Sequence, residues 1–335
     1  MTAEIKPSTP QQYDALSLPG LLTIAELGSD ELVALIASAE RAKRTLKTTP
    51  GELSAALAGK SVTMLFEKPS LRTRMSFEIG LTKLGAHVIY FDHSKQRIGE
   101  RESVKDYAKN LERWTDAVVA RVFDHGVLEQ FAQHASVPVV NALSDLEHPC
   151  QTLADLLTLK ERFGSFEGLR VAWIGDGNNV CHSLMLACAK LGIGFTAVTP
   201  PGFEPKFEVV RAAATAAESS GAVITISNSP NKVAGHHAVY TDTWVSMGQE
   251  HHKPWTEQPF AGFQVDDELM ALASEGLGQP SLFMHCLPAH RGEEVTDTVI
   301  DSPQSVVYDQ AENRMHAQNA LFLALFSDQQ ASSEQ

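Results

Sequence analysis

The 335-residue sequence has few cysteines, few aromatic residues and no long hydrophobic run. Its four cysteines show no C-x-x-C spacing, so the sequence predicts neither a disulfide framework nor a cysteine zinc site. No apolar run approaches the roughly 20 residues that cross a bilayer, and the polar N-terminus lacks the apolar segment of a secretory signal. We therefore expect a protein of a reducing compartment, the cytoplasm, with no membrane partner.

Positive charge is also scarce, with 27 Lys and Arg against 41 Asp and Glu, a net charge of −14. Such a surface repels nucleic acids and acidic membranes, so we expect no nucleic-acid partner. Three cations nevertheless gather in one short segment, at Lys68, Arg72 and Arg74. A basic cluster in an acidic chain is typical of a focused site for a small anion.

The basic cluster lies where a strand is predicted to pass into a helix. Residues 61–66 form a short apolar run of buried-strand type, and residues 75–84 carry an apolar stripe of helical type. The N-terminus of such a helix has unpaired N–H groups and the positive end of the helix dipole. With the hydroxyls of Ser70 and Thr73, this predicts an oxyanion site. Arg72 and Arg74 are two residues apart and cannot both face one ligand, so we expect one of them to bind phosphate and the other to form a structural pair.

Apolar runs alternate with helical patterns along the whole chain, which indicates parallel sheets with helices on both faces. We predict two doubly wound α/β domains joined by a long helix, with a C-terminal helix packing back on the first domain. The first domain is expected to hold residues 1–150 and 315–335, and the second residues 151–314. The predicted strands are residues 61–66, 86–91, 116–121, 137–142, 169–176, 195–199, 222–227, 238–242, 282–287 and 305–308.

Polar clusters follow several of these strands, and open parallel sheets bind ligands at the carboxyl ends of their strands. Each cluster also has an ordinary explanation: Arg121 would pair with a nearby acid, His148 would cap the helix after it, and Cys286 would be an inert buried thiol. G-D-G-N-N lacks the third glycine of a dinucleotide loop. His285 and His290 have no recognised metal spacing, which favours packed or solvated histidines.

Taken together, S-L-R-T-R, H-P-C-Q, D-T-W-V-S-M-G and H-C-L-P are more specific than any one of them. In this order the chain resembles the aspartate/ornithine carbamoyltransferase family from about residue 21 to residue 326. The S-M-G segment, H-C-L-P and A-E-N-R resemble its ornithine branch. The resemblance implies transfer of a carbamoyl group from carbamoyl phosphate to L-ornithine, giving L-citrulline for arginine biosynthesis, without cofactor or metal, in a homotrimer or a multiple of it.

The resemblance also implies roles for individual residues. Arg72, Arg121, His148 and Cys286 would be catalytic, with Arg121 and His148 donating to the carbamoyl oxygen where negative charge grows. A cis Leu287–Pro288 peptide would aim backbone carbonyls at the carbamoyl amide. Carbamoyl phosphate would be bound by Ser70, Leu71, Arg72, Thr73, Arg97, Arg121, His148, Gln151, Cys286, Leu287 and Arg314. Ornithine would be bound by Asn179, Asp242, Ser246 and Met247.

Two positions depart from the family pattern. Leu71 stands where the pattern has threonine, so we expect it to contribute its backbone N–H. Arg97 stands where ornithine enzymes often have glutamine, and Gln96 comes one residue earlier. Arg97 and Gln96 therefore remain alternatives for a contact with the site of a neighbouring subunit.

Two other functions remain to be weighed. A carbamoyltransferase for an N-acylated ornithine would have no α-ammonium to pair with Asp242, and one for putrescine would have no carboxylate for Asn179. A non-catalytic anion-binding module on the same fold would be expected to have lost some of the clusters. The chain retains all of them, which favours an enzyme.

Overall fold

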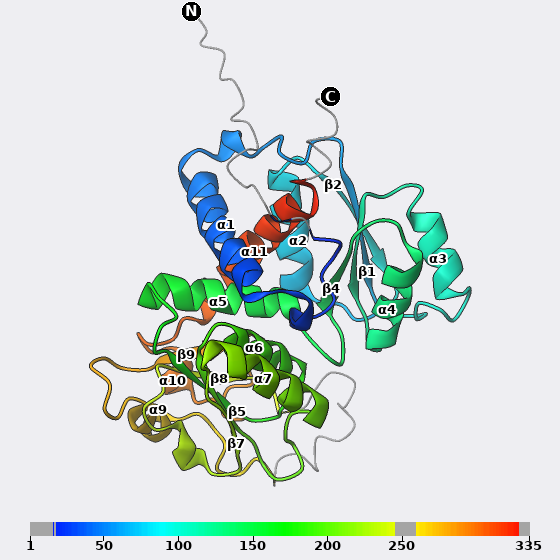
Figure 1. Ribbon diagram of the computed structural model, residues 1–335. Coiled ribbons are helices and arrows are strands. Elements are labelled where there is room, and N and C mark those ends of the chain that lie inside the picture. Colours follow the sequence, from blue (N-terminus) through cyan, green and yellow to red (C-terminus); the bar gives the residue numbers. More distant parts are fainter. Residues whose placement is uncertain (1–15, 17, 245–258, 328–335) are drawn as a thin grey trace, which may run out of the picture. The chain divides into compact units, whose positions relative to one another are not determined.

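The computed structural model describes residues 16, 18–244 and 259–327, and these form two compact units (Figure 1). Of the described residues, unit 1 holds those up to Leu22, Asp30–Leu143 and those from Asn313 onward. Unit 2 holds Thr23–Ser29 and Ser144–Glu312. Each unit contains one parallel sheet, which confirms the predicted two-domain α/β fold. The chain passes from unit 2 back to unit 1 within one long helix, α11 (Val307–Leu325).

The sheet of unit 1 has the strand order β2-β1-β3-β4, with all neighbours parallel. From β1 the chain winds to β2 on one side and then crosses back to β3 on the other. The strand order therefore reverses between β1 and β3, and the carboxyl ends at such a switch point form the crevice where open α/β sheets bind ligands. The strands are β1 (Ser61–Phe66), β2 (His87–Asp92), β3 (Ala117–Arg121) and β4 (Val139–Leu143).

Helices cover both faces of this sheet. The apolar sides of α3 and α4 pack with β1, β3 and β4 in one buried cluster that includes Leu65, Val118 and Phe131. On the other side of the sheet α2 packs against α11 (Figure 1), where the rings of Phe77 and Phe322 meet edge to face at 6.1 Å. This contact confirms that the C-terminal helix packs back on the first unit. The helices are α1 (Ser29–Thr48), α2 (Leu71–Lys83), α3 (Val104–Leu111) and α4 (His125–His134), with η3 (Pro50–Glu52) after α1.

The sheet of unit 2 has the order β7-β6-β5-β8-β9, again parallel throughout. Its switch point lies between β5 and β8. The strands are β5 (Arg170–Ile174), β6 (Gly194–Val198), β7 (Ile224–Ser227), β8 (Ala238–Thr241) and β9 (Leu282–His285). The helices are α5 (Pro149–Phe163), α6 (Asn179–Lys190), α7 (Phe207–Ser220), α9 (Asp267–Ala273) and α10 (Asp297–Ile300), with the short turns η2 (Ile24–Glu26) and η4 (Pro230–Val233).

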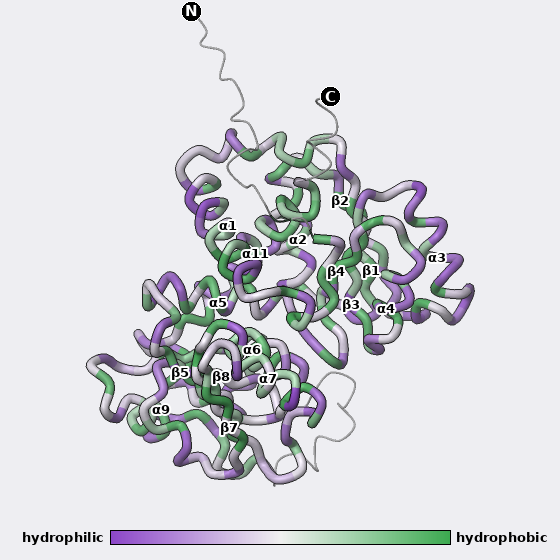
Figure 2. The backbone as a smooth tube through the Cα atoms, in the orientation of Figure 1, coloured by the Kyte–Doolittle hydropathy of each residue, from purple (hydrophilic) through white to green (hydrophobic). Residues whose placement is uncertain are grey.

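The central strands of unit 2 are buried on both faces. This explains why they appear in the sequence as near-continuous apolar runs, which is typical of parallel sheets. Trp173 of β5 and Tyr240 of β8 stack at 5.0 Å and are fully buried. Figure 2 shows green, hydrophobic residues among the strands of this unit. Among the described residues, no helix combines the length and the apolar character needed to cross a membrane.

Two details of the sequence prediction are wrong. Residues 305–308 do not form a strand, because Ser305 makes only an isolated bridge to Phe283 and α11 begins at Val307. Val307 is buried in the apolar cluster of unit 2 as part of that helix. In α2, Met75 and Ile79 of the predicted apolar stripe are exposed rather than buried. Other boundaries move by a few residues, which is usual for element ends.

Candidate active site

The basic cluster of unit 1 surrounds the start of α2, as predicted. Ser70 is its N-cap in an extended conformation, and its Oγ accepts a hydrogen bond from the N–H of Thr73 at 3.4 Å. The Ser70 hydroxyl also donates to Thr73 Oγ1 at 3.0 Å. The helix thus presents its N-terminus at the carboxyl end of β1, where the dipole and the first-turn N–H groups favour an anion.

The two arginines of the cluster differ in their partners. Arg74 pairs with Glu78 through a 2.9 Å contact between Nε and Oε2, and its guanidinium lies 4.0 Å above the Tyr90 ring. This is the structural pair that the spacing predicted. Arg72 is half-buried and makes no hydrogen bond or ion pair with any residue that the structure describes. Its guanidinium therefore remains available to an anionic ligand.

Leu71 is the first residue of α2, and its side chain is 73% exposed. Because its side chain is apolar, Leu71 can offer an anion only its backbone N–H. The prediction that Leu71 contributes through the backbone stays a prediction, but this geometry fits it.

Arg314 approaches the same helix from α11. It is 4% exposed, and its Nη2 donates to Oγ1 of the buried Thr73 at 3.3 Å. A buried guanidinium requires hydrogen-bond partners or a counter-anion. The hydroxyl of Thr73 thus links Arg314 with the cap residue Ser70 on one helix N-terminus.

Arg121 ends β3 on the other side of the unit 1 switch point. It stands opposite Phe66 in the parallel register, and its carbonyl accepts from the N–H of Glu67 at 2.9 Å. The register against β4 shifts between Ala120 and Arg121. Arg121 and the Ser70 segment therefore follow adjacent strands of one sheet.

Glu67 is a buried carboxylate at this edge that the sequence analysis missed. Its Oε1 accepts from the N–H of Ile98 and its Oε2 from the N–H of Phe123, both at 2.9 Å. Arg97 lies 4.4 Å above the Phe123 ring. Glu67 thus holds the loop that carries Arg97 against the end of β3. Beside it lies a cavity of about 380 Å³ lined by Glu67, Arg97, Ile98, Gly99, Glu100, Ser103, Val104, Asp124, Val127 and Gln130.

In unit 2, Asp242 follows β8 at the switch point and is surrounded by donors. Its Oδ2 accepts from Asn178 Nδ2 at 2.9 Å, and its Oδ1 accepts from Cys286 Sγ at 3.0 Å and the N–H of Thr243 at 2.8 Å. Asn178 also caps α6 by accepting from its first N–H groups. The predicted residue Asn179 instead donates to the carbonyl of Ser144 at 2.5 Å.

Asn178 is the functional candidate that the sequence analysis missed. Its place directly before α6 is a capping signal, but only the fold brings it to Asp242. Gly177 precedes it, and a Cβ there would lie 2.3 Å from the backbone nitrogen of Pro205. The glycine therefore serves close backbone packing. Two predicted ornithine residues, Ser246 and Met247, lie outside the described residues.

His148 occupies the N-cap position of α5, but its side chain makes no capping bond. Its backbone N–H donates instead to Ser183 Oγ, whose hydroxyl donates to Glu147, each at 2.9 Å. Glu147 also accepts from the N–H of Ile24 at 2.9 Å. Burial raises the pKa of Glu147 to about 7. This chain of bonds holds the start of α5, and with it the buried His148.

Gln151, one turn into α5, belongs to a buried polar network. Its Nε2 donates to Asp155 Oδ1 at 2.8 Å, and Gln310 Nε2 donates to the same oxygen at 2.9 Å. Gln310 in turn accepts from the N–H of His285 at 3.0 Å. All four residues are at most 1% exposed. The network orients the Gln151 amide and ties it to the end of β9.

The segment after β9 has an unusual backbone. Leu287 is the one described residue other than glycine with a positive φ, 58°, and the Leu287–Pro288 peptide is cis, as the resemblance implied. The N–H of Leu287 donates to His285 Nδ1 at 2.8 Å. Since this nitrogen accepts, the ring proton lies on Nε2, which contacts Glu294 Oε1 at 3.2 Å.

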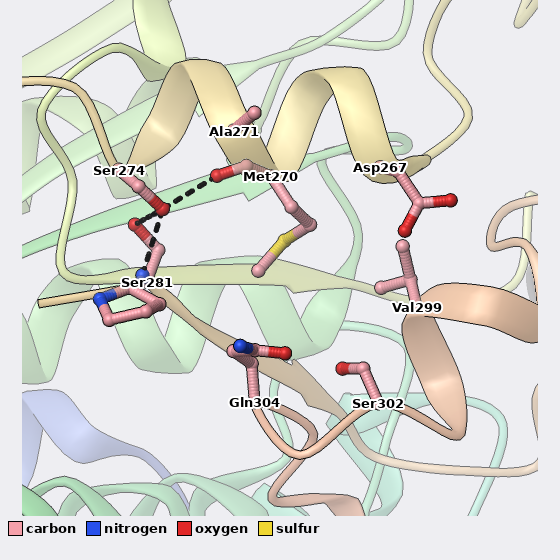
Figure 3. Close-up of a pocket in the computed structure, with 9 residues that line it drawn as sticks. Asp267, Met270, Ala271, Ser274, Ser281, Val299, Ser302 and Gln304 are labelled. Atoms are coloured by element: carbon pink, nitrogen blue, oxygen red, sulfur yellow. Dashed lines mark hydrogen bonds between the residues drawn. The ribbon is translucent and has the colours of Figure 1, made fainter.

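A second cavity, of about 230 Å³, lies in unit 2 under α9 (Figure 3). Ser281 lines it at the amino end of β9, whereas His285 ends that strand. The Ser274 and Ser281 hydroxyls are engaged with each other and with the backbone: Ser274 accepts from the N–H of Ser281 at 3.0 Å and donates to the Met270 carbonyl at 2.8 Å. This cavity contains none of the predicted site residues.

Family models and known proteins match the chain over both units. Residues 20–161 match the family model "Aspartate/ornithine carbamoyltransferase, carbamoyl-P binding domain", and residues 167–325 match the "Asp/Orn binding domain" of the same family. The chain is 49% identical over 306 residues to the ornithine carbamoyltransferase of Shewanella oneidensis, covering 91% of this chain and 99% of the relative. It is 46% identical over 312 residues to that of Methanoculleus marisnigri, covering 93% and 98%.

Solved structures give the same result. The ornithine carbamoyltransferase from Pyrococcus furiosus superposes with a TM-score of 0.88 at 43% identity, covering 94% of this chain and 99% of that one. The anabolic ornithine carbamoyltransferase from Campylobacter jejuni superposes with a TM-score of 0.85 at 34% identity, covering 93% and 100%.

Proposed function

This chain belongs to the aspartate/ornithine carbamoyltransferase family, and from that premise we propose its reaction. It transfers the carbamoyl group of carbamoyl phosphate to the δ-amine of L-ornithine, giving L-citrulline and phosphate. The observation that carries this proposal is a carboxylate suited to an α-ammonium, Asp242, at the unit 2 switch point of a chain whose relatives are named ornithine carbamoyltransferase.

Carbamoyl phosphate is bound chiefly by cations and first-turn N–H groups of unit 1. The exposed start of α2 supports a phosphate role for Ser70, Leu71, Arg72 and Thr73, as does the Arg72 guanidinium, which has no partner among the described residues. Arg121 and Arg314 complete the cationic surroundings, and Arg97 or Gln96 contributes from a neighbouring subunit. From unit 2, Gln151 and the carbonyls of Cys286 and Leu287 accept from the carbamoyl amide.

Ornithine is bound in unit 2. Asp242 pairs with its α-ammonium, Asn179 with its carboxylate, and Ser246 and Met247 contact its stem. Asn178 holds the Asp242 carboxylate in place through a 2.9 Å hydrogen bond. Asn178 is therefore a positioning residue that does not touch the substrate itself.

The chemical step needs no enzyme nucleophile. The neutral δ-amine forms a bond to the carbamoyl carbon, the bond from that carbon to the bridging oxygen breaks, and phosphate leaves with the electron pair and takes the proton that nitrogen loses. Arg121 and His148 stabilise the oxygen that becomes negative in between. The Cys286 thiol donates to Asp242 at 3.0 Å, which supports a positioning role near the amine. The remaining contribution is orientation of the two substrates.

The broader context follows from the family resemblance. We propose a homotrimer or a multiple of it, a cytoplasmic location, and a role in arginine biosynthesis. We also propose that residues 1–150 and 315–335 form the carbamoyl phosphate domain and residues 151–314 the ornithine domain. Light scattering tests the assembly: a mass of three times the 36.4 kDa chain, or a multiple of that, is expected.

One assay tests the reaction. Citrulline formation from carbamoyl phosphate and ornithine is measured beside carbamoylation of putrescine, N-acetylornithine and aspartate. Ornithine is expected to have the highest kcat/KM. A higher kcat/KM for putrescine or acetylornithine would show that ornithine is not the acceptor. It would leave the proposed carbamoyl phosphate site unaffected.

A further inference from the structure

The turn after β9 gathers three side chains outside the proposed substrate sites. His290 Nδ1 lies 3.7 Å from Glu293 Oε2 and 3.8 Å from Glu294 Oε2. One nitrogen and two carboxylate oxygens of this cluster all lie within 4.8 Å of one another. The side chains of His290 and Glu293 are 47% and 34% exposed, whereas Glu294 is fully buried.

The two oxygens of Glu294 are in different situations. Oε1 accepts from the Nε2–H of His285 and from the backbone N–H of His290. Oε2 is buried and accepts no hydrogen bond from any residue that the structure describes. A buried carboxylate oxygen without a partner is costly, so its presence calls for an explanation. It lies on the side of the carboxylate that approaches the His290 ring.

The groups around this carboxylate are largely engaged elsewhere. His285 Nδ1 accepts from the N–H of Leu287, which leaves Nε2 of that ring for Glu294 Oε1. Arg291 is engaged with Asp297 and Asp301 in contacts of 2.6–2.8 Å. The turn itself is held by Gln264, which donates to the carbonyls of Gly292 and Glu293.

We propose that His290, Glu293 and Glu294 bind a divalent metal ion of the zinc class. Imidazole nitrogen together with carboxylate oxygen suits such ions, which often take three protein ligands and complete their shell with water. Two bonds of about 2.0–2.1 Å at a tetrahedral angle place their ligand atoms about 3.4 Å apart. The separations of 3.7 and 3.8 Å need only a small adjustment of the exposed side chains.

The bound ion stabilises the segment that follows β9. It satisfies Glu294 Oε2, while Oε1 continues to hold His285, whose ring accepts from Leu287. The ion takes no part in carbamoyl transfer, so this site stands or falls independently of the proposed function. An ion that binds the folded chain but not the unfolded chain raises the stability of the folded chain by mass action.

The test is equilibrium dialysis of the full chain against Zn²⁺ at pH 7.5. Asp242, His285 and Cys286 form a second group of possible ligands, so all proteins carry Cys286→Ser, which removes the thiol from that group. We expect one Zn²⁺ per chain in this background. Adding His290→Ala should weaken Zn²⁺ binding at least tenfold, and adding Glu293→Gln should weaken it to a similar extent.

His87→Ala is the matched control, because His87 is also exposed but belongs to unit 1. It should leave Zn²⁺ affinity unchanged. Zn²⁺ should raise the melting temperature of the background and of the control, but not of the His290→Ala protein. Since His290 is half exposed, its loss should leave the fold intact, which the melting curve without metal checks.

Two results would overturn the proposal. One is Zn²⁺ affinity that is the same with and without His290. The other is no bound Zn²⁺ at millimolar concentration together with a His290 pKa raised well above its ordinary value in NMR titration, which would assign the cluster to an ion pair between the imidazolium and the two carboxylates.

Discussion

The two units hold their predicted site residues in different ways. In unit 1 the anion site begins at an exposed helix start, and Arg72 has no partner among the described residues. In unit 2 Asp242, Gln151 and Asp155 are tied into hydrogen-bond networks, two of them fully buried. A cation left without a partner gains its interaction energy from the ligand, whereas a buried network is oriented before any ligand arrives. Substitutions should therefore affect mainly binding in unit 1, and binding together with stability in unit 2.

The largest effect is expected at Arg72. Arg72→Ala should lower kcat/KM for carbamoyl phosphate about 10³-fold, because a guanidinium that clamps a transferring group stabilises the transition state. The melting temperature should change little. Arg74→Ala is the matched control, since that arginine pairs with Glu78, and it should cost less than tenfold in steady-state kinetics. Equal losses in both variants would contradict the assignment.

Asp242 should come second. Asp242→Asn keeps the shape but removes the charge that pairs with the ammonium, so kcat/KM for ornithine should fall about 10²-fold. The affinity for carbamoyl phosphate, measured by calorimetry, should stay within twofold. Loss of carbamoyl phosphate binding in this variant would show that the residues for carbamoyl phosphate and those for ornithine do not act separately.

Asp155 tests stability in unit 2. Its Oδ1 accepts from both Gln151 and Gln310, so Asp155→Asn brings an amide donor into a place built for an acceptor. We expect a loss of about 2 kcal/mol in the free energy of unfolding, measured in urea. Asp30→Asn, an exposed carboxylate in the first turn of α1, should cost less than about 1 kcal/mol. Similar losses would mean that the network adds nothing.

Counted per pH unit, the smallest effect is a stability slope from Glu147, whose pKa burial raises from 4.5 to about 7. Between these values the folded chain keeps a proton that the unfolded chain has lost. The contribution of Glu147 is therefore complete below pH 4.5 and is lost as pH rises through 7, at about 1.4 kcal/mol per pH unit. Glu147→Gln should remove this component from the stability profile measured in urea between pH 5 and 7. Parallel profiles would contradict it.

Much of the fold was predictable from local patterns. Buried parallel strands appear in the sequence as short apolar runs, so the nine strands among the described residues were located from periodicity to within a few residues. The prediction failed at residues 305–308, where an apolar pair belongs to the start of a buried helix. Periodicity alone does not separate the two over so short a run.

The sequence by itself determined the two α/β units, the family, and the order of the polar segments along the chain. It also indicated that Arg72 and Arg74 have different roles, because helical geometry separates positions two apart. Only the tertiary structure decided which distant residues meet. Asn178 reaches Asp242 across 64 residues, and Glu67 joins two loops through backbone N–H groups that carry no sequence signal. His290 and Glu294 are only four residues apart, but the fold decides that the Glu294 carboxylate is buried there. Long-range contacts and burial depend on strand order and loop path, which local residue patterns do not encode.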